Sequence, residues 1–300
     1  MLTNFFSTTK PVNSMFIIGL FACYVVTSFF TNYIDVVNIP LFLWFLTLFG
    51  IVNFVNSRNN LTFDNSYFFL FFCILLGFFP EVFKINTLFY SNLILIIYIR
   101  RVYSFQSSKN IIKKLFDSGF WIGISFLIEP YTLLFFPLTF IGILVHEHID
   151  VRRIFTPIIG FSVPIILYFT YCFWYSELEN FYNLLSWKTN YDFSIYNTSR
   201  YIILFSLLLI LITLASILKT PKTFRVKNTF RKSWILICFH FFFSLVLVVL
   251  LSERSGTELL YIIFPAALII ANGFELFQKK WYSDIILIGI LSASLLSYFS

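Results

Sequence analysis

Long apolar runs follow one another along the whole chain and are separated by short polar segments. A transmembrane helix needs about 20 mostly apolar residues to cross the hydrocarbon core of a bilayer. The runs predict eleven helices, some of them short enough to be buried among neighbours or to lie where the bilayer is thinned. With no internal repeat and no low-complexity linker, residues 1–300 are predicted to form one all-α integral membrane domain. The helices are expected at about 14–31, 38–56, 66–80, 87–100, 117–129, 131–146, 154–176, 201–219, 234–251, 259–276 and 282–299.

The composition agrees with a chain dissolved in lipid. Hydrophobic residues make up 59% of the 300 positions and charged residues only 12%. Soluble domains carry about 25% charged residues, so no aqueous fold of this length could enclose so much apolar surface. The net charge of +7 would also suit a nucleic-acid binder, but cytoplasmic loops of membrane proteins carry a positive excess as well. We therefore expect membrane lipids, and no nucleic acid, as partners.

The sequence FLIEP, which ends at Pro130, interrupts the apolar run at 120–145. A hairpin turning there puts the basic segments RRVYSFQSSKNIIKK and KTPKTFRVKNTFRK on the same side of the membrane, with 17 of the 21 Lys and Arg residues. The positive-inside rule then predicts a cytoplasmic N-terminus and an outer C-terminus. Proline suits the turn because it lacks an N–H and is tolerated in the first turn of a helix. The four outer exceptions are Lys84, Lys188, Arg200 and Arg254.

Glu129 lies at the apex of this hairpin, at or just below the outer surface. Desolvation there disfavours the charged carboxylate unless a cation is close to it. We expect Glu129 to pair with one of the four outer cations or to remain protonated and hydrogen-bonded. Pairing would make the hairpin one wall of a cavity at the outer face.

Two further outer segments bring carboxylates close to other functional groups. FFPEVFK places Glu81 directly after Pro80, and SERSGTE gathers Glu253, Arg254 and Glu258 in a short turn. A carboxylate near a guanidinium can serve as a base and a phosphate clamp. The same groups could equally form a helix-capping salt bridge or simply solvate a short loop.

The longest outer segment, residues 176–200, is rich in aromatic residues. Its apolar side chains favour a helix lying in the membrane interface, with Lys188 and Arg200 placed to meet an anionic headgroup. An aromatic belt with snorkelling cations is an equally good interpretation. The apolar positions are Phe181, Tyr182, Leu184, Leu185 and Trp187.

Metal and cofactor chemistry has little support in the sequence. The four cysteines form no CxxC pair, which argues against a disulfide framework or a zinc site. HEHID at 146–150 is better explained as a solvated turn than as a metal site. His240 in the ninth span is slightly better explained as a structural hydrogen-bonding group than as a functional one. Walker, dinucleotide-binding, zincin and serine-elbow motifs are absent, so we expect no metal and no cofactor.

Between Pro80 and Tyr175 the order of features resembles the lipid-dependent membrane glycosyltransferases of the GT-C class. The stretch NTLFYSNLILIIYIRRVYSF is followed by a basic segment and then by FDSGFWIGISFLIEPYTLLFFPLTFIGILV. As in that class, a helix with G-x-x-x-G-like small residues leads to a proline-marked hairpin, and Arg152 and Arg153 follow at the next cytoplasmic turn. The resemblance implies a GT-C-like helical core and sugar transfer from a polyprenyl-phosphate carrier.

The chain departs from that class in its first outer loop. TNYIDVVNIP is about ten residues long and holds Asp35 as its candidate acid, whereas the class has a long loop with a catalytic acid and two surface helices. Glu129 also stands where the class often has Lys. The whole chain, including the opening MLTNFFSTTKP, is similar to a family of inner-membrane proteins of flavobacteria and other Bacteroidetes that carries no known activity.

Two functions of different classes follow as expectations. The first is an enzyme of the bacterial inner membrane that transfers a sugar from polyprenyl phosphate at the outer face. Its candidate catalytic acids are Asp35, Glu81 and Glu129, and its candidate lipid-phosphate contacts are Lys188, Arg200 and Arg254. The second is a non-catalytic scaffold with membrane-protein partners in an envelope-assembly or secretion complex, because little protein projects to exclude water from a site. A transporter ranks third, since the chain has only ten glycines and no paired acids within a span.

Overall fold

The computed structural model describes residues 2–34, 39–147, 149–187, 189–225, 228–252, 254–277 and 280–299. This part of the chain is all-helical, with thirteen α-helices, five 3₁₀ helices and no strand. Each of the eleven predicted apolar runs coincides with a helix, which confirms the all-α prediction. The helices are α1 Leu2–Phe6, α2 Pro11–Phe30, α3 Ile39–Asn59, α4 Tyr67–Phe78, α5 Thr87–Tyr103, α6 Ile111–Ile128, α7 Phe136–Val145, α8 Val151–Trp174, α9 Leu178–Leu185, α10 Ser199–Arg225, α11 Asn228–Leu250, α12 Leu260–Phe274 and α13 Lys280–Leu296. The 3₁₀ helices are η1 Pro80–Val82, η2 Ser104–Gln106, η3 Pro130–Phe135, η4 Ser194–Tyr196 and η5 Thr257–Leu259.

Six helices of the described chain are long and apolar enough to cross a membrane. They lie at Pro11–Phe30, Pro40–Asn59, Val151–Trp174, Ser199–Arg225, Phe230–Leu250 and Thr257–Phe274. Three shorter apolar helices cover Tyr67–Phe78, Pro130–Val145 and Trp281–Leu296. This set of helices is that of a multi-pass membrane protein. The sidedness derived from the positive charges stays a prediction.

Two helices are longer than hydropathy indicates. α10 continues through Lys219 to Arg225, and α11 already begins at Asn228. Most of the basic segment interpreted as a cytoplasmic loop is therefore helical. Within it, the side chain of Lys219 is buried against a carboxylate instead of lying in water.

The chain divides into two compact units, each described by itself. Unit 1 comprises Met1–Lys84, Asp192–Lys227 and Arg254–Ser300, and unit 2 comprises Ile85–Tyr191 and Asn228–Glu253. The expectation of a single domain is not decided by this division and stays a prediction.

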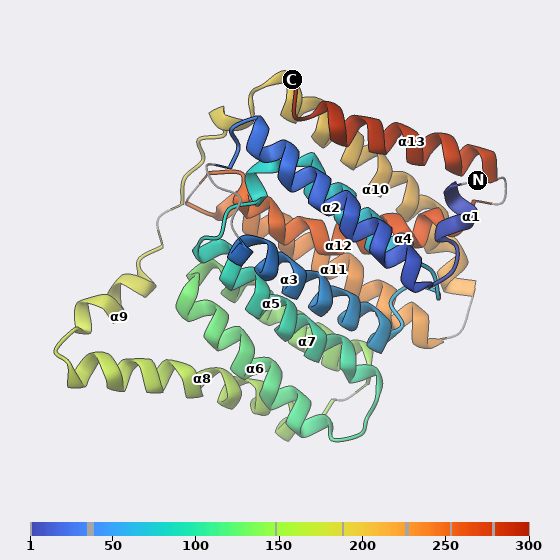
Figure 1. The fold of residues 1–300 in the computed structure, drawn as a ribbon. Helices are drawn as coiled ribbons and strands as arrows, with labels where there is room; N and C mark the ends of the chain where they lie inside the picture. The colour runs from blue at the N-terminus through green and yellow to red at the C-terminus, as the bar shows by residue number, and fades with distance from the viewer. Residues whose placement is uncertain are drawn as a thin grey trace. The chain divides into compact units, whose positions relative to one another are not determined.

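Unit 1 is built around α12, which packs against α4 and α10 (Figure 1). All residues of Thr257–Phe274 are buried inside the protein. All of α4 is buried as well, and α2 and α13 cover it. α10 differs sharply from α12 in burial, although both are long enough to cross a bilayer. Only 28% of the most apolar stretch of α10 is buried inside the protein.

Aromatic rings fill the space between the helices of unit 1. The ring of Phe21 in α2 lies within 5.7 Å of the ring centroids of Phe42, Phe45, Phe49 and Phe83. Such stacked and edge-to-face pairs add stability beyond the burial of their area. Many of the phenylalanines in the sequence therefore pack against one another in this unit.

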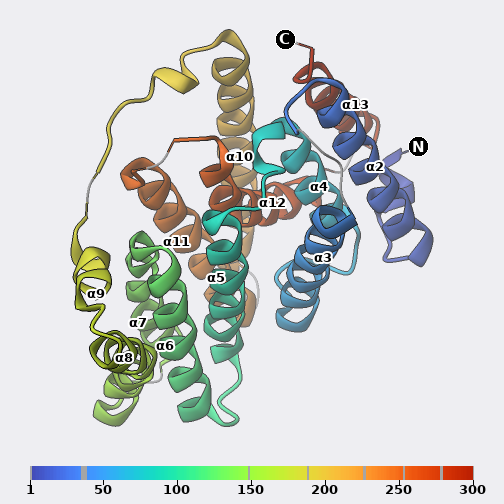
Figure 2. The ribbon, with the colours of Figure 1, turned by 60° about the vertical axis from the view of Figure 1, so that its left-hand side comes forward.

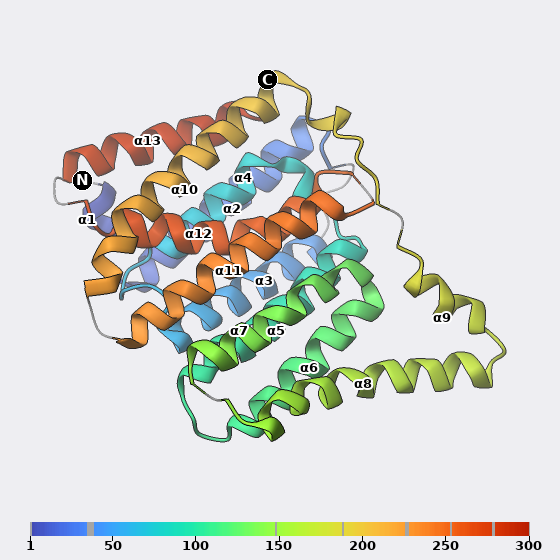
Figure 3. The same ribbon diagram turned by 180° about the vertical axis from the view of Figure 1, so that it is seen from behind.

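Small residues allow the helices of unit 2 to approach one another closely. A Cβ built at Gly119 of α6 would lie 1.9 Å from the carbonyl oxygen of Pro157, and one built at Gly160 of α8 would lie 2.2 Å from that of Phe116. The G-x-x-x-G-like run of α6 is thus the surface on which α8 packs, as small-residue contacts between membrane helices do. Figure 3 shows the two helices side by side at this contact, and Figure 2 shows α8 end-on.

The helix break predicted at Glu129 and Pro130 is confirmed. α6 ends at Ile128, Glu129 is extended with φ −139° and ψ 102°, and Pro130 begins η3. The carbonyl of Glu129 accepts hydrogen bonds from N–H and Oγ1 of Thr132, at 3.0 and 2.8 Å. Beyond η3 the chain runs back along α6 as α7 (Figure 3).

Candidate functional site

Glu81 and Arg200, two of the predicted site residues, form an ion pair in unit 1. Glu81 lies in η1 just after α4, and Arg200 is the second residue of α10. Oε1 of Glu81 contacts Nη2 of Arg200, with 14% and 8% of the two side chains exposed. Because both charges are largely removed from water, loss of either partner would leave the other poorly compensated. The pair therefore ties the end of α4 to the start of α10.

Two tyrosines enclose the Arg200 guanidinium. Its Nη1 donates a hydrogen bond to Oη of Tyr33. Its Cζ lies 5.1 Å from the ring centroid of Tyr33 and 4.5 Å from that of Tyr201. Cations are attracted to the faces of aromatic rings at such distances, so the orientation of Arg200 is determined by a carboxylate, a hydroxyl and two rings.

Gly256 brings a second backbone segment against Glu81. Its φ is +86°, a conformation that L side chains rarely adopt. A Cβ built there would lie 2.6 Å from Cβ of Glu81 and 3.2 Å from Oη of Tyr201. The turn after Arg254 can thus approach the ion pair only because this position lacks a side chain.

Glu258 anchors the polar segment that precedes α10. Its side chain is fully buried and accepts hydrogen bonds from the Tyr196 hydroxyl and, at 3.2 Å, from the Ser255 N–H. Burial raises the pKa of the Tyr196 hydroxyl well above its ordinary value, and the neighbouring charge of Glu258 raises it further. Tyr196 therefore remains a neutral donor, which is what a buried carboxylate requires.

Arg254 contacts the same polar segment. Its Cζ lies 4.2 Å from the ring centroid of Phe193. Residues 193–196 are thus connected to the turn before α12 through Phe193 and Tyr196, and Gly256 in that turn lies against Glu81. Among the described residues, Oε2 of Glu81 is buried and has no hydrogen-bond partner. This oxygen has no surface open to solvent, so a substrate hydroxyl would reach it only after the surrounding side chains move.

The other predicted site residues are placed differently. Glu129 belongs to unit 2, where it caps α6 and is partly buried, and its predicted pairing stays a prediction. Asp35 and Lys188 lie outside the described residues, as does Glu253. The cluster thus contains Glu81, Arg200 and Arg254 of the six candidates.

The tyrosines of this cluster were not predicted from the sequence. Tyr33, Tyr196 and Tyr201 are three of 17 tyrosines in the chain, and nothing in their local sequence marks them as partners of charged groups. The nearest signal is the direct succession of Arg200 and Tyr201. Glu258 was recognised as part of a charged turn, but not as a buried acceptor.

A second buried ion pair lies in unit 1, near the other end of α10. Nζ of Lys219 is 3.3 Å from Oε2 of Glu275 and 4.7 Å from the ring centroid of Phe63. Oε1 of Glu275 accepts hydrogen bonds from the Phe63 N–H at 3.1 Å and from Nδ2 of Asn65 at 2.7 Å. Burial raises the pKa of the Glu275 carboxyl, and the charge of Lys219 counteracts that rise.

The histidine in the ninth span has a structural environment. Nδ1 of His240 lies 3.0 Å from Oη of Tyr103, and its ring contacts that of Phe135. These contacts agree with the interpretation of His240 as a hydrogen-bonding group within the bundle. Within the described ranges no three His, Cys, Asp or Glu side chains gather as metal ligands would, and His148 of the HEHID segment lies outside those ranges.

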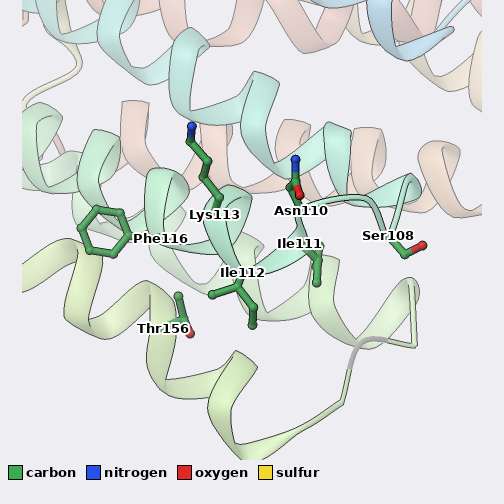
Figure 4. Close-up of a pocket in the computed structure, with 7 residues that line it drawn as sticks. All are labelled: Ser108, Asn110, Ile111, Ile112, Lys113, Phe116 and Thr156. Atoms are coloured by element: carbon green, nitrogen blue, oxygen red, sulfur yellow. The ribbon is translucent and has the colours of Figure 1, made fainter.

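A shallow hollow of about 800 Å³ lies in unit 2, beside the first turns of α6. Figure 4 shows Ile111 and Ile112 on the side of Thr156, whereas Lys113 points the other way. The side that faces α8 is therefore mainly apolar. It offers no set of polar groups that converges on one point.

The apolar helices, six of them long enough to cross a bilayer within the described ranges, define a multi-pass helical membrane protein. Within that class the chain belongs to DUF6427, a family of unknown function that matches residues 1–300. No curated protein and no solved structure matches the chain. The family assigns no activity, so any function must be argued from the residues of the site.

Proposed function

We propose that the protein is an enzyme of the bacterial inner membrane that transfers a sugar from a polyprenyl-phosphate carrier to an acceptor hydroxyl. The observation that carries the proposal is the association of Glu81 and Arg200 with the turn that follows Arg254. A carboxylate and two guanidinium groups on separate elements of unit 1 belong to one cluster, and one oxygen of the carboxylate is unpartnered among the described residues.

In this reaction Glu81 is the general base. The acceptor oxygen forms a bond to the anomeric carbon of the sugar while the bond from that carbon to the phosphate oxygen breaks. The acceptor proton passes to Glu81, and polyprenyl phosphate leaves as an anion. Arg200 orients Glu81, and Arg254 stabilises the leaving phosphate, as guanidinium groups do through charge-assisted hydrogen bonds.

A second candidate function has its own observation. The guanidinium of Arg200 is bound by Glu81 and Tyr33 and is largely buried, which is also what a purely structural link between two helices requires. A non-catalytic scaffold of an envelope-assembly or secretion complex would need nothing more from this cluster.

The test uses the purified full chain in nanodiscs with radiolabelled polyprenyl-phosphate sugars and an acceptor-containing membrane fraction. Transfer of label is expected for the natural protein and is expected to fall about 100-fold or more for Glu81→Gln, the range typical of a general base. Glu179→Gln, at an exposed position of α9, is the matched control and should retain full transfer.

Stability must be measured in parallel, because Glu81→Gln also leaves Arg200 without its counter-charge. Glu81→Asp keeps the charge and should fold normally while still transferring label slowly. Absence of transfer by the natural protein, together with a stoichiometric protein partner in mild detergent, would favour the scaffold instead. Full transfer by a folded Glu81→Gln variant would exclude Glu81 as the base.

A further inference from the structure

A polar cavity of about 280 Å³ lies where three helices of unit 1 end. Its walls come from the start of α2, the end of α3 and the start of α4. Phe68 and Phe69 of α4 contribute an aromatic part of the lining, and most of the other lining side chains are polar. In a chain with 59% hydrophobic residues, such a set of amides and hydroxyls in one cavity is unusual.

Several of the polar lining groups are held in place by the protein itself. Nδ2 of Asn56 donates to Oγ1 of Thr62 at 2.9 Å, and Nδ2 of Asn65 donates to Glu275 at 2.7 Å. Ser66 donates to the carbonyl of Thr8 at 3.0 Å. These contacts make the wall rigid, and a preformed wall lowers the entropic cost of binding a ligand.

The side chains of three other lining residues are not held by contacts within the described part of the protein. Within the described residues, the side chains of Lys10, Ser14 and Asn53 have neither a hydrogen bond nor an ion pair with the protein. One ammonium, one hydroxyl and one amide are thus available at the same cavity. Together they suit a phosphate ester, which accepts hydrogen bonds and carries negative charge.

A carboxylate stands beside these groups. Oγ1 of Thr9, another lining residue, donates to Oδ1 of Asp64 at 2.5 Å, and Asp64 is exposed. A cation at Lys10 thus lines the cavity, and an anion at Asp64 lies beside its wall. This pair of charges complements a ligand that carries both signs.

The position of the cavity indicates how such a ligand would arrive. It lies at the ends of helices that can cross a membrane, so it is at the level of the lipid headgroups. Directly beside it, α2 exposes Val12, Met15 and Phe16, with 52%, 72% and 65% of their surface accessible. Acyl chains can pack along these side chains while the headgroup enters the cavity.

We propose that this cavity binds the phosphoethanolamine headgroup of a membrane phospholipid. The phosphate contacts Lys10, Ser14 and Asn53, and the ammonium contacts Asp64. The site does not depend on sugar transfer, and none of its residues belongs to the Glu81 cluster.

The test is calorimetric titration of the purified full chain in detergent with dihexanoyl phosphatidylethanolamine. Binding is expected, and Lys10→Gln should weaken it about tenfold, as loss of one charge-assisted hydrogen bond would. Lys109→Gln is the matched control, because Lys109 is exposed and lies in unit 2. Equal affinities of the natural protein and both Lys variants would overturn the proposal.

Two further probes separate the sources of the headgroup chemistry. Dihexanoyl phosphatidylglycerol lacks the ammonium and should bind more weakly than the ethanolamine lipid, and Asp64→Asn should abolish that difference. Equal binding of the two lipids to the natural protein would refute the role of Asp64. Soluble phosphoethanolamine should bind at least tenfold more weakly than the lipid, since it lacks the acyl contacts. Binding as tight as that of the lipid would identify a free phosphate ester as the ligand and would overturn the lipid site.

Discussion

Nζ of Lys219 lies 3.3 Å from Oε2 of Glu275, and only 4% and 5% of the two side chains are exposed. The pair connects α10 to the residue that follows α12. Two amide donors, the Phe63 N–H and Nδ2 of Asn65, complete the environment of the carboxylate. Both partners must therefore be considered together when either is changed.

Stability should depend on pH through Glu275. Burial raises the pKa of its carboxyl in the folded protein, so the folded state holds this proton more tightly than the unfolded state does. The contribution of the proton is present at low pH and is lost as pH rises through the folded pKa. Thermal unfolding of the full chain between about pH 4 and about pH 8 should show this loss.

Two variants check the assignment of that pH dependence. Glu275→Gln should remove the part due to this group, whereas Lys219→Met should enlarge it, because the cation that favours the carboxylate is gone. An unchanged pH profile in Glu275→Gln would show that another group is responsible.

Gly256→Ala should destabilise unit 1 by about 1–3 kcal/mol, the usual cost of a non-glycine residue in this backbone region. Its Cβ would also lie 2.6 Å from Cβ of Glu81. Chemical unfolding in mixed micelles measures the effect. Gly19→Ala is the control, because nothing lies within 4 Å of a Cβ at that helical position, and it should stabilise by about 0.5–1 kcal/mol. Equal changes for the two variants would contradict the geometry of the turn.

Gly160→Ala should lower the stability of unit 2 by about 1–3 kcal/mol through overpacking of α6 against α8. The added methyl would be 2.2 Å from the Phe116 carbonyl oxygen, which belongs to rigid backbone. Gly50→Ala in α3 again offers a helical site with open space. Proteolysis of the loop between α5 and α6 at increasing denaturant would report the loss, and unchanged protection would argue against the close contact.

Hydropathy was sufficient to locate eleven apolar helices. Six helices of the described chain have the length that the thickness of a bilayer imposes on a span. Hydropathy ended one of the predicted spans at residue 219, whereas α10 continues to Arg225 and carries the charged Lys219 inside the helix. The charge is tolerated inside the helix only because Glu275, far away in the sequence, lies next to it.

The candidate site likewise has a part that the sequence predicts and a part that depends on packing between distant segments. Glu81, Arg200 and Arg254 were identified from their residue types and expected side of the membrane. The partnership of Glu81 with Arg200 spans 119 positions and depends on how α4 and α10 pack. A pattern along one sequence contains no such pairing, and the tyrosines around Arg200 have no local mark at all.

Tyr196→Phe should destabilise the protein by about 1.5–3 kcal/mol, the value of a hydrogen bond to a charged group. The buried carboxylate of Glu258 would keep only the Ser255 N–H among the contacts described above. Tyr191→Phe, at an exposed position, should change the midpoint of thermal unfolding very little. A loss of the same size in both variants would indicate that the hydroxyl of Tyr196 is not a special donor.

The predicted sidedness can be measured with single cysteines in a chain whose four native cysteines have been replaced. A cysteine at Asn183 in α9 should react with an impermeant maleimide in intact spheroplasts. One at Ser107 should react only after lysis, because the positive-inside rule places it in the cytoplasm. Both positions are exposed, so their accessibility depends on the membrane alone, and labelling of Ser107 in intact cells would reverse the topology.

The complete enclosure of α12 has a consequence for the order of assembly during synthesis. Unit 2 ends at Glu253, so all of its helices can be in the membrane before α12 has been made. Unit 1 begins with the first residues and yet lacks its central helix until Phe274 has left the ribosome. Membrane helices insert first and associate afterwards, so α4, which packs directly against α12, must wait in lipid for a partner encoded near the far end of the gene. A stop codon before α12 would therefore leave the N-terminal segment of unit 1 without its core helix, although every residue of that segment had been translated.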